Sequence, residues 1–303
     1  MCMENAQHYP VMHREILEGL GIGGRKLVLD CTLGLGSLAA KCLEALPADA
    51  VLVGIDRDPQ SLGIAGERLA VYGDRVRLVR ENFVNLAEVL AKLGLGQPDA
   101  IIFDLGISTY QLSAQGRGFS FLNDSPLDMR MDPKAFLSAY ELVNNLSVEE
   151  LANIFYRFGE ERFSRRIAAF IVKSRQREPI SGTRELADIV SDALGGRRGN
   201  FRIHPATRVF QALRIAVNNE LEACRIGIGK AAQVLAPKGR MAVVAFHSLE
   251  DRIVKNMFKD LKTAGEFDII TKKPLVPSQE EIRDNSASRS AKLRIAQRTV
   301  KND

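Results

Sequence analysis

Three short apolar runs, ending at Asp30, Asp56 and Asp104, constrain the fold of this chain most strongly. Helical stretches separate the runs, and such alternation is typical of a parallel sheet that is covered by helices on both faces. Ligands of open α/β sheets bind at the carboxyl ends of the strands. We therefore expect a doubly wound α/β sheet with the three aspartates along one rim.

The α/β pattern is interrupted in the middle of the chain. Residues 138–196 carry helical patterns and no convincing strand, and S-V-E-E at 147–150 is a capping box that starts one of these helices. The sequence predicts a discontinuous domain made of residues 1–111 and 205–303. An all-helical insert at 112–204 interrupts it.

The α/β pattern then resumes toward the carboxyl end. One long helix is expected over 205–235, and the apolar run at 240–246 is expected to form another buried strand. The segments at 267–271 and 292–297 fit an antiparallel pair that closes the sheet.

Composition excludes several classes of protein. The 303 residues are 46% hydrophobic and 26% charged, as in ordinary globular domains. No run reaches the roughly 18 apolar residues of a membrane span, and the amino-terminal residues lack the apolar core of a secretory signal. We expect a cytoplasmic protein that does not associate with membranes. The net charge of +5 permits a nucleic-acid partner without requiring one.

The four cysteines form no C-x-x-C pair, and their spacing supports neither a disulfide framework nor a structural zinc site. We therefore expect no metal.

A glycine-rich turn follows the first strand. Gly34 and Gly36, with Ala39, satisfy a loose G-x-G-x-x-A dinucleotide pattern. Asp30 decides between the two ligands that such a turn could hold. Its carboxylate would repel a pyrophosphate, but it would attract the ammonium group of S-adenosylmethionine. The turn therefore favours S-adenosylmethionine over the nicotinamide cofactor of an oxidoreductase.

Two further residues suit the same ligand. Asp56 could accept hydrogen bonds from the ribose hydroxyls, or it could cap the helix that begins near Pro59. Phe83 follows the third strand, where its ring could stack on adenine or belong to the core.

Motifs along nearly the whole chain support a more specific interpretation. They include H-Y-P-V at 8–11, I-D-R-D-P at 55–59, D-L-G-I-S-T-Y-Q-L at 104–112, R-G-F-S-F at 117–121, P-L-D-M-R-M-D at 126–132, G-E-E-R-F at 159–163, H-P-A-T-R-V-F-Q-A at 204–212, F-H-S-L-E-D-R at 246–252 and L-R-I-A at 293–296. With these motifs the chain resembles the bacterial small-subunit ribosomal RNA (cytosine-N4-)-methyltransferase family. One departure is the glycine turn, because the family usually continues it as G-x-G-G-H.

The resemblance implies a Rossmann-like class I methyltransferase that methylates the 4-amino group of a cytidine in the decoding region of small-subunit ribosomal RNA. It implies assembled small subunits as the substrate, and a homodimer is a further option. The cofactor positions that it implies in this sequence are Gly36, Ser37, Leu38, Asp56, Phe83, Asp104 and Gln111.

Asp104 is the candidate catalytic residue. The exocyclic amine of cytosine is a poor nucleophile because its lone pair is conjugated into the ring. A carboxylate that accepts an N–H hydrogen bond would orient this amine and could take its proton. Asp104 could instead only fix the loop or contact the methionine part of the cofactor.

The target base must leave its stack to react, so substrate contacts are also expected. The candidates are Ser108, Arg117, Phe119, His247 and Ser248. Phe119 could stack on the base or lie in the core. Arginines of the insert, together with Arg197, Arg198, Arg202 and Arg208, could contact phosphates or form a solvated face. The alternative function is a ribosome-assembly or RNA-binding protein of the same fold with weakened catalysis.

Overall fold

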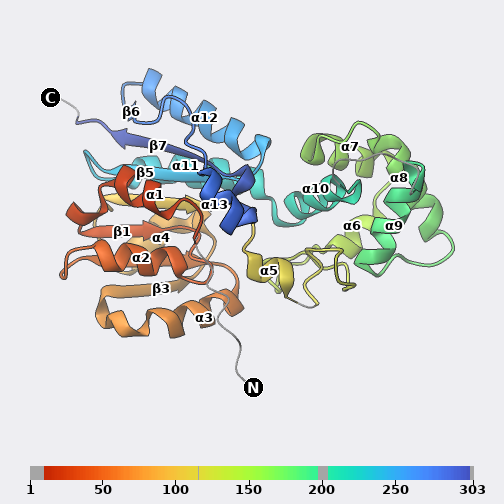
Figure 1. Cartoon of the computed structure of the whole chain (residues 1–303), viewed down its shortest axis with the longest axis horizontal. Coiled ribbons are helices and arrows are strands. Elements are labelled where there is room, and N and C mark those ends of the chain that lie inside the picture. The colour runs from red at the N-terminus through yellow and green to blue at the C-terminus, as the bar shows by residue number, and fades with distance from the viewer. Residues whose placement is uncertain (1–9, 115, 197–203, 301–303) are drawn as a thin grey trace. The chain divides into compact units, whose positions relative to one another are not determined.

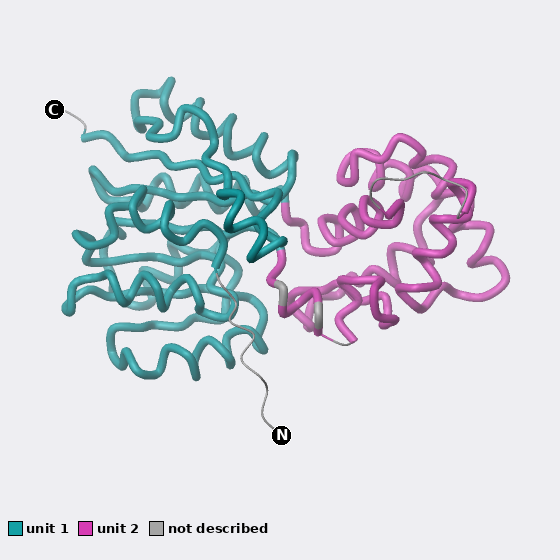
Figure 2. The backbone as a smooth tube through the Cα atoms, in the orientation of Figure 1, with its two compact units in different colours: residues 1–106, 221–303 teal, residues 107–220 magenta. Residues whose placement is uncertain are grey.

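The computed structural model of the chain describes residues 10–114, 116–196 and 204–300. The chain divides into two compact units (Figure 2). We call Met1–Gly106 with Leu221–Asp303 the sheet unit, and Ile107–Glu220 the helical unit. The sequence placed the insert at 112–204, so the helical unit extends further in both directions. Arg197, Arg198, Arg202 and the first two residues of H-Y-P-V lie outside the described residues.

The sheet unit is built on a seven-stranded sheet with the order β3-β2-β1-β4-β5-β7-β6. Its strands are β1 (Leu27–Asp30), β2 (Val51–Asp56), β3 (Val76–Arg80), β4 (Ala100–Asp104), β5 (Arg240–Ala245), β6 (Phe267–Ile269) and β7 (Lys292–Arg298). The pairs among β1–β5 are all parallel, whereas β7 runs antiparallel to both β5 and β6. The doubly wound sheet and its closing antiparallel pair are confirmed.

Helices cover both faces of this sheet (Figure 1). One core layer contains α1 (His13–Leu20), α2 (Ser37–Ala45) and α3 (Pro59–Leu69). The other contains α4 (Leu86–Lys92), α11 (Glu220–Val234) and α12 (Ser248–Thr263). Alternate strand residues divide between the layers: Val28 of β1 packs in the first and Leu29 in the second. The remaining elements are α13 (Gln279–Asp284) and the 3-10 helices η1 (Ile22–Gly24), η2 (Ala70–Arg75), η3 (Phe83–Asn85) and η5 (Ser286–Ser290).

The helical unit has a hydrophobic core of its own, to which α6, α7, α8, α9 and α10 contribute. Its helices are α5 (Thr109–Ser113), α6 (Ala139–Asn145), α7 (Val148–Gly159), α8 (Ser164–Arg175), α9 (Thr183–Ala193) and α10 (Ala206–Asn218). The capping box at the start of α7 is confirmed, because Ser147 and Glu150 each accept a hydrogen bond from the other's backbone N–H. No helix in the described residues is long and apolar enough to cross a membrane.

The single helix expected over 205–235 is wrong. The chain forms α10 and α11 instead, because Asn219 adopts a left-handed conformation with φ 49° that ends α10. The Arg214 guanidinium donates two hydrogen bonds, at 3.0 and 2.9 Å, to the Glu220 carboxylate just beyond the break. This break explains the extent of the helical unit, since α10 packs against α7 and belongs to that unit's core.

Candidate active site

The three aspartates end adjacent strands at the point where the strand order reverses. Asp30 of β1 pairs with Gly54 of β2 on one side and with Ile102 of β4 on the other. Asp56 and Asp104 are the last residues of β2 and β4. The carboxyl ends of the strands at such a switch point form the usual ligand crevice of doubly wound folds. The structure thus brings the predicted acids to one rim.

Thr32 links two of these acids. Its backbone N–H donates to Asp30 Oδ1 at 3.1 Å, and its hydroxyl accepts from the backbone N–H of Asp104 at 2.6 Å. Asp30 is only 1% exposed. Thr32 is not among the residues predicted from the sequence, although its place directly after the first strand was a usable signal.

The rim holds negative charge where water cannot stabilise it. Burial, with a smaller contribution from the nearby charge of Asp56, raises the pKa of Asp30 to about 7, although the hydrogen bond from the Thr32 N–H acts to lower it. Burial raises the pKa of Asp104 to about 8, with added repulsion from Asp30 and Glu250. Asp104 Oδ1 is shielded from solvent and has no hydrogen-bond partner among the residues that the structure describes. A cationic ligand would satisfy this set of carboxylates.

The glycine turn leaves a helix start open beside this rim. Gly34 and Gly36 have φ of 53° and 74°, a region that favours glycine. A Cβ on Gly36 would lie 3.0 Å from Leu69 Cδ1. Within the described part of the chain, no side-chain hydrogen bond caps α2 at its N-cap residue Gly36. The first amides of α2, which begins at Ser37, are therefore suited to an anionic group such as a carboxylate.

The departure from G-x-G-G-H is accommodated locally. Arg68 of α3 donates one hydrogen bond to the Leu35 carbonyl at 3.0 Å and another to the Ser37 hydroxyl. Leu38 is 6% exposed and its side chain packs in the core beneath α2. Arg68 is not among the residues predicted from the sequence, because a helical pattern does not show that the Arg68 side chain reaches the glycine turn.

Asp56 faces the glycine turn. Its two carboxylate oxygens accept from the backbone N–H groups of Gly34 and Asp58, each at 2.8 Å. Asp58, not Asp56, caps α3 by accepting from the backbone N–H of Gln60. Burial raises the pKa of Asp56 from its ordinary value. Each oxygen of Asp56 keeps further accepting capacity.

Phe83 lies at the start of η3, partly exposed, and meets Phe103 edge to face with ring centroids 5.5 Å apart. Phe83 thus packs against the second core layer and remains partly exposed.

His247 and Ser248 lie at the start of α12. His247 Nδ1 accepts from the backbone N–H of Glu250 at 3.3 Å, so the imidazole caps the helix. Glu250 is 2% exposed and its Oε2 accepts from the backbone N–H of Phe246 at 2.9 Å. Glu250 is a buried acid whose charge raises the pKa of Asp104, and it is not among the residues predicted from the sequence. Its place three residues after the helix cap was the available signal.

Two predicted residues cap α5 in the helical unit. The Ser108 hydroxyl accepts from the backbone N–H of Gln111 at 3.1 Å, and the Gln111 carboxamide oxygen accepts from the backbone N–H of Ser108 at 3.2 Å. The cap fixes both side chains, and Gln111 is buried.

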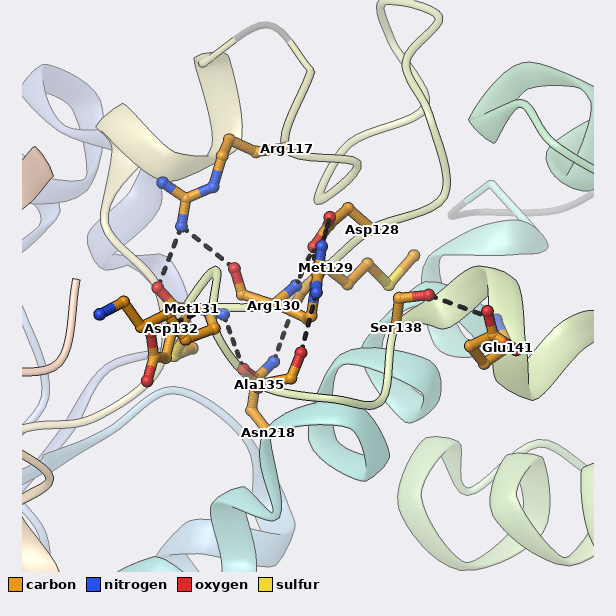
Figure 3. A network of polar contacts seen from close by, with 11 residues as sticks. Arg117, Asp128, Met129, Arg130, Met131, Asp132, Ala135, Ser138, Glu141 and Asn218 are labelled. Atoms are coloured by element: carbon orange, nitrogen blue, oxygen red, sulfur yellow. Dashed lines mark hydrogen bonds and ion pairs between the residues drawn. The ribbon is translucent and has the colours of Figure 1, made fainter. Parts of the chain in front are cut away.

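Arg117 supports the loop at 126–132 (Figure 3), and Phe119 lies beside the Arg117 guanidinium. Arg117 donates to the carbonyls of Arg130 and Met131 at 3.1 and 3.2 Å, and its guanidinium lies 5.7 Å from the centroid of the Phe119 ring. Phe119 is 6% exposed and belongs to the core of the helical unit. Both side chains therefore have structural partners within their own unit.

Asn218, at the end of α10, holds the other side of this loop. Its carboxamide oxygen accepts from the backbone N–H of Met131 at 2.8 Å, and its nitrogen donates to the carbonyl of Met129 at 2.7 Å. Arg130 forms a two-pronged ion pair with Asp128 (Figure 3). The motif P-L-D-M-R-M-D thus forms a loop that hydrogen bonds hold on both sides.

Arg208, a predicted phosphate contact, is exposed. Its guanidinium Nη1 lies 3.8 Å from Oε2 of Glu161.

The sheet order, the acidic rim and the open helix start after a glycine turn together define a class I S-adenosylmethionine-dependent methyltransferase. A family model described as the MraW methylase family matches residues 5–299, and the chain belongs to this family.

Relatives named ribosomal RNA small subunit methyltransferase H include proteins from Syntrophotalea carbinolica and Geobacter sulfurreducens. Each is 46% identical, over 98% of this chain and 100% of the first relative, and over 96% of this chain and 98% of the second. A solved structure described as a putative rRNA-methylase from Clostridium thermocellum matches 95% of this chain and 93% of that chain. At 12% identity and a TM-score of 0.46, it is too distant to bear on the site.

Proposed function

We propose that this protein transfers a methyl group to the exocyclic 4-amino group of a cytidine in the decoding region of small-subunit ribosomal RNA. The names of its relatives support the RNA substrate. The observation that carries the chemistry is Oδ1 of Asp104, which is shielded from solvent and has no hydrogen-bond partner among the described residues, at the switch point of the sheet. Because ligands bind at the carboxyl ends of the strands, a residue at the end of β4 can orient the amine and accept its proton.

The rim residues fit S-adenosylmethionine, which supplies an electrophilic methyl group on a cationic sulfur. Asp30 is the counter-charge for its ammonium group, and the first amides of α2, from Ser37 and Leu38, would hold its carboxylate. Asp56 would accept from the ribose hydroxyls, and the partly exposed ring of Phe83 would stack on adenine. Gly34 and Gly36 shape the turn, and the family resemblance adds Gln111.

Asp104 would act on the amine of the target base. Its Oδ1 accepts one amine N–H, which turns the nitrogen lone pair out of conjugation with the ring. As the new N–C bond formed, the bond between the methyl group and the sulfur would break and a neutral thioether would leave. The nitrogen would become positive and lose a proton to the Asp104 carboxylate. The backbone N–H of Asp104 donates a hydrogen bond to the Thr32 hydroxyl, and this bond holds Asp104 in place.

On the RNA side, His247 and Ser248 line a shallow hollow together with Arg289 and Lys292, which would attract phosphate. Ser108, Arg117 and Phe119 would act by holding α5 and the 126–132 loop in shape. We further propose that the substrate is the assembled small subunit and that the reaction takes place in the cytoplasm. A homodimer is the oligomeric state to be tested.

Mass spectrometry of nucleosides tests this function directly. The purified protein, the methyl donor and either assembled small subunits or free small-subunit RNA are incubated, and the digested RNA is analysed. We expect N4-methylated cytidine at one position, with a higher yield from assembled subunits. Unmodified RNA from both substrates would overturn the proposal. Sedimentation of the same sample reports whether the protein is a dimer.

A further inference from the structure

Helix α8 presents a basic face that the proposed active site does not use. Residues 162–177 contain no acidic residue. Five cationic side chains in this stretch are exposed: Arg162, Arg165, Arg166, Lys173 and Arg177. None of them makes an ion pair or hydrogen bond within the part of the chain that the structure describes. Neighbouring cations without acids repel one another, and an anionic partner would relieve this repulsion.

Two aromatic rings lie on the same face. Phe163, just before the first residue of α8, is 53% exposed, and Phe170 is 38% exposed. Arg166 and Lys173 fall between and beyond them at helical spacing, so rings and cations alternate along the helix. The two rings are seven residues apart, which is about 10.5 Å along a helix axis.

The core prevents the helix from turning these rings inward. Ile167 and Ile171, on the side of α8 that packs inward, are fully buried in the core of the helical unit and fix the rotation of the helix. The ends of the helix are also fixed. Glu161 accepts from the backbone N–H of Phe163 at 2.9 Å, and Arg175 donates to the carbonyls of Val143 and Leu146 at 2.5 and 2.6 Å. The exposed face is therefore a rigid property of the fold.

We propose that the face formed by Arg162, Phe163, Arg165, Arg166, Phe170, Lys173 and Arg177, the α8 basic face, binds a single-stranded segment of the RNA substrate. The cations contact phosphates, and Phe163 and Phe170 stack on unpaired bases. Alternating cations and exposed aromatic rings are the chemistry by which proteins hold single strands. This inference rests on the proposed function, because it names the surface that receives the same RNA.

A membrane or an acidic protein would require a different face. A helix that lies in a membrane buries a continuous apolar stripe, but here the continuous stripe of α8 is already in the core. Acidic side chains would satisfy the cations without using the rings. The neighbouring helix α9 shows the ordinary alternative, since its exposed positions mix Arg184 with Glu185 and Asp188.

Binding of full-length variants to a fluorescent decoding-region RNA, measured over a series of salt concentrations, tests the proposal. We expect the double charge reversal Arg166→Glu with Lys173→Glu to weaken binding at least tenfold at low salt and to reduce the salt slope by about two. We expect Phe163→Ala with Phe170→Ala to weaken binding by about 10- to 100-fold without changing that slope. All four residues are exposed or nearly so, and unchanged melting temperature and cofactor affinity would verify folding.

The matched control is the double charge reversal Lys255→Glu with Lys259→Glu on α12, two exposed lysines one helical turn apart. It changes net charge equally and should leave most of the RNA affinity intact. Equal losses in both charge variants would overturn the proposal. Unchanged binding of free RNA with lost activity on assembled subunits would also overturn it, because the face would then contact ribosomal protein. This binding assay needs no methyl transfer, so its outcome is separate from the test of the proposed function.

Discussion

The acidic rim of the sheet unit and the α8 basic face place charge in opposite environments. Asp30 is 1% exposed and its pKa is raised to about 7, because its charged form lacks water. The cations of the α8 basic face are exposed to solvent. A buried charge exchanges a proton when its ligand arrives, whereas an exposed one exchanges counterions.

The difference predicts how each region responds to conditions. Ligand binding at the rim should depend on pH and little on salt, because buried interactions are weakly screened. Binding at the α8 basic face should depend steeply on salt and little on pH, because arginine and lysine stay charged near neutrality. Variants that act on one region alone can break or sharpen this contrast.

The largest effect is expected from Asp104→Asn. An amide oxygen can still accept an N–H but cannot take the proton, so turnover should fall by about 10²- to 10⁴-fold. Single-turnover methylation measures this, and RNA affinity and its salt slope should not change. Asp268→Asn, an exposed position on β6, is the matched control. Wild-type turnover in Asp104→Asn would remove this residue from the chemistry.

A smaller effect is expected from Asp56→Ala. The carboxylate would lose its hydrogen bonds to the ribose, and bonds to a charged acceptor contribute about 1.5–3 kcal/mol. Cofactor affinity should therefore fall by about 10- to 100-fold in isothermal titration. Because Asp56 also holds the backbone of Gly34, the melting temperature of the unliganded variant is measured alongside. Unchanged cofactor affinity would show that the sugar is held elsewhere.

Much of this rim was predictable from the sequence, because a strand and the residue at its end are local features. Asp30, Asp56 and Asp104 could be placed together without any structure. The sequence also marks the positions of Thr32 and Glu250, directly after a strand and in the first turn of a helix. Their effects on Asp104 were not predictable, since these depend on how β1, β4 and α12 meet in space.

The helical unit shows what the sequence could not predict. The helical pattern continues through 205–235, and the break at Asn219 depends on a single left-handed residue. Phe119 was left with two interpretations, of which a core position was favoured over a stacking surface. Only packing shows that it is buried.

The next prediction concerns pH. The pKa values of Asp30 and Asp104 are raised to about 7 and about 8 from an ordinary value of 3.8. The folded state therefore holds protons that the unfolded chain releases, and this contribution to stability is lost as pH rises from about 4 through 8. A cationic cofactor favours the carboxylates and should release protons when it binds.

Cofactor affinity should accordingly rise by about tenfold between pH 6 and pH 8. Asp56 and Glu250 face the same rim and add to the negative field. Titrations in buffers of different ionisation enthalpy count the released protons, and Asp104→Asn should release fewer. RNA affinity, measured at constant salt over the same pH range, serves as the internal control and should not change. A level cofactor affinity would contradict the raised pKa values.

The smallest effect is expected from Arg68→Ala, which removes the two hydrogen bonds from α3 to Leu35 and Ser37. Arg68 is charged, but it acts on the glycine turn through neutral acceptors in an exposed position, where each bond contributes about 0.5–1.5 kcal/mol. We expect cofactor affinity to fall by about two- to tenfold, with turnover at saturating cofactor unchanged. Arg68→Lys should restore part of the affinity, because one ammonium can still reach one acceptor. Equal affinity in wild type and Arg68→Ala would show that Gly34 and Gly36 hold the turn without help from α3.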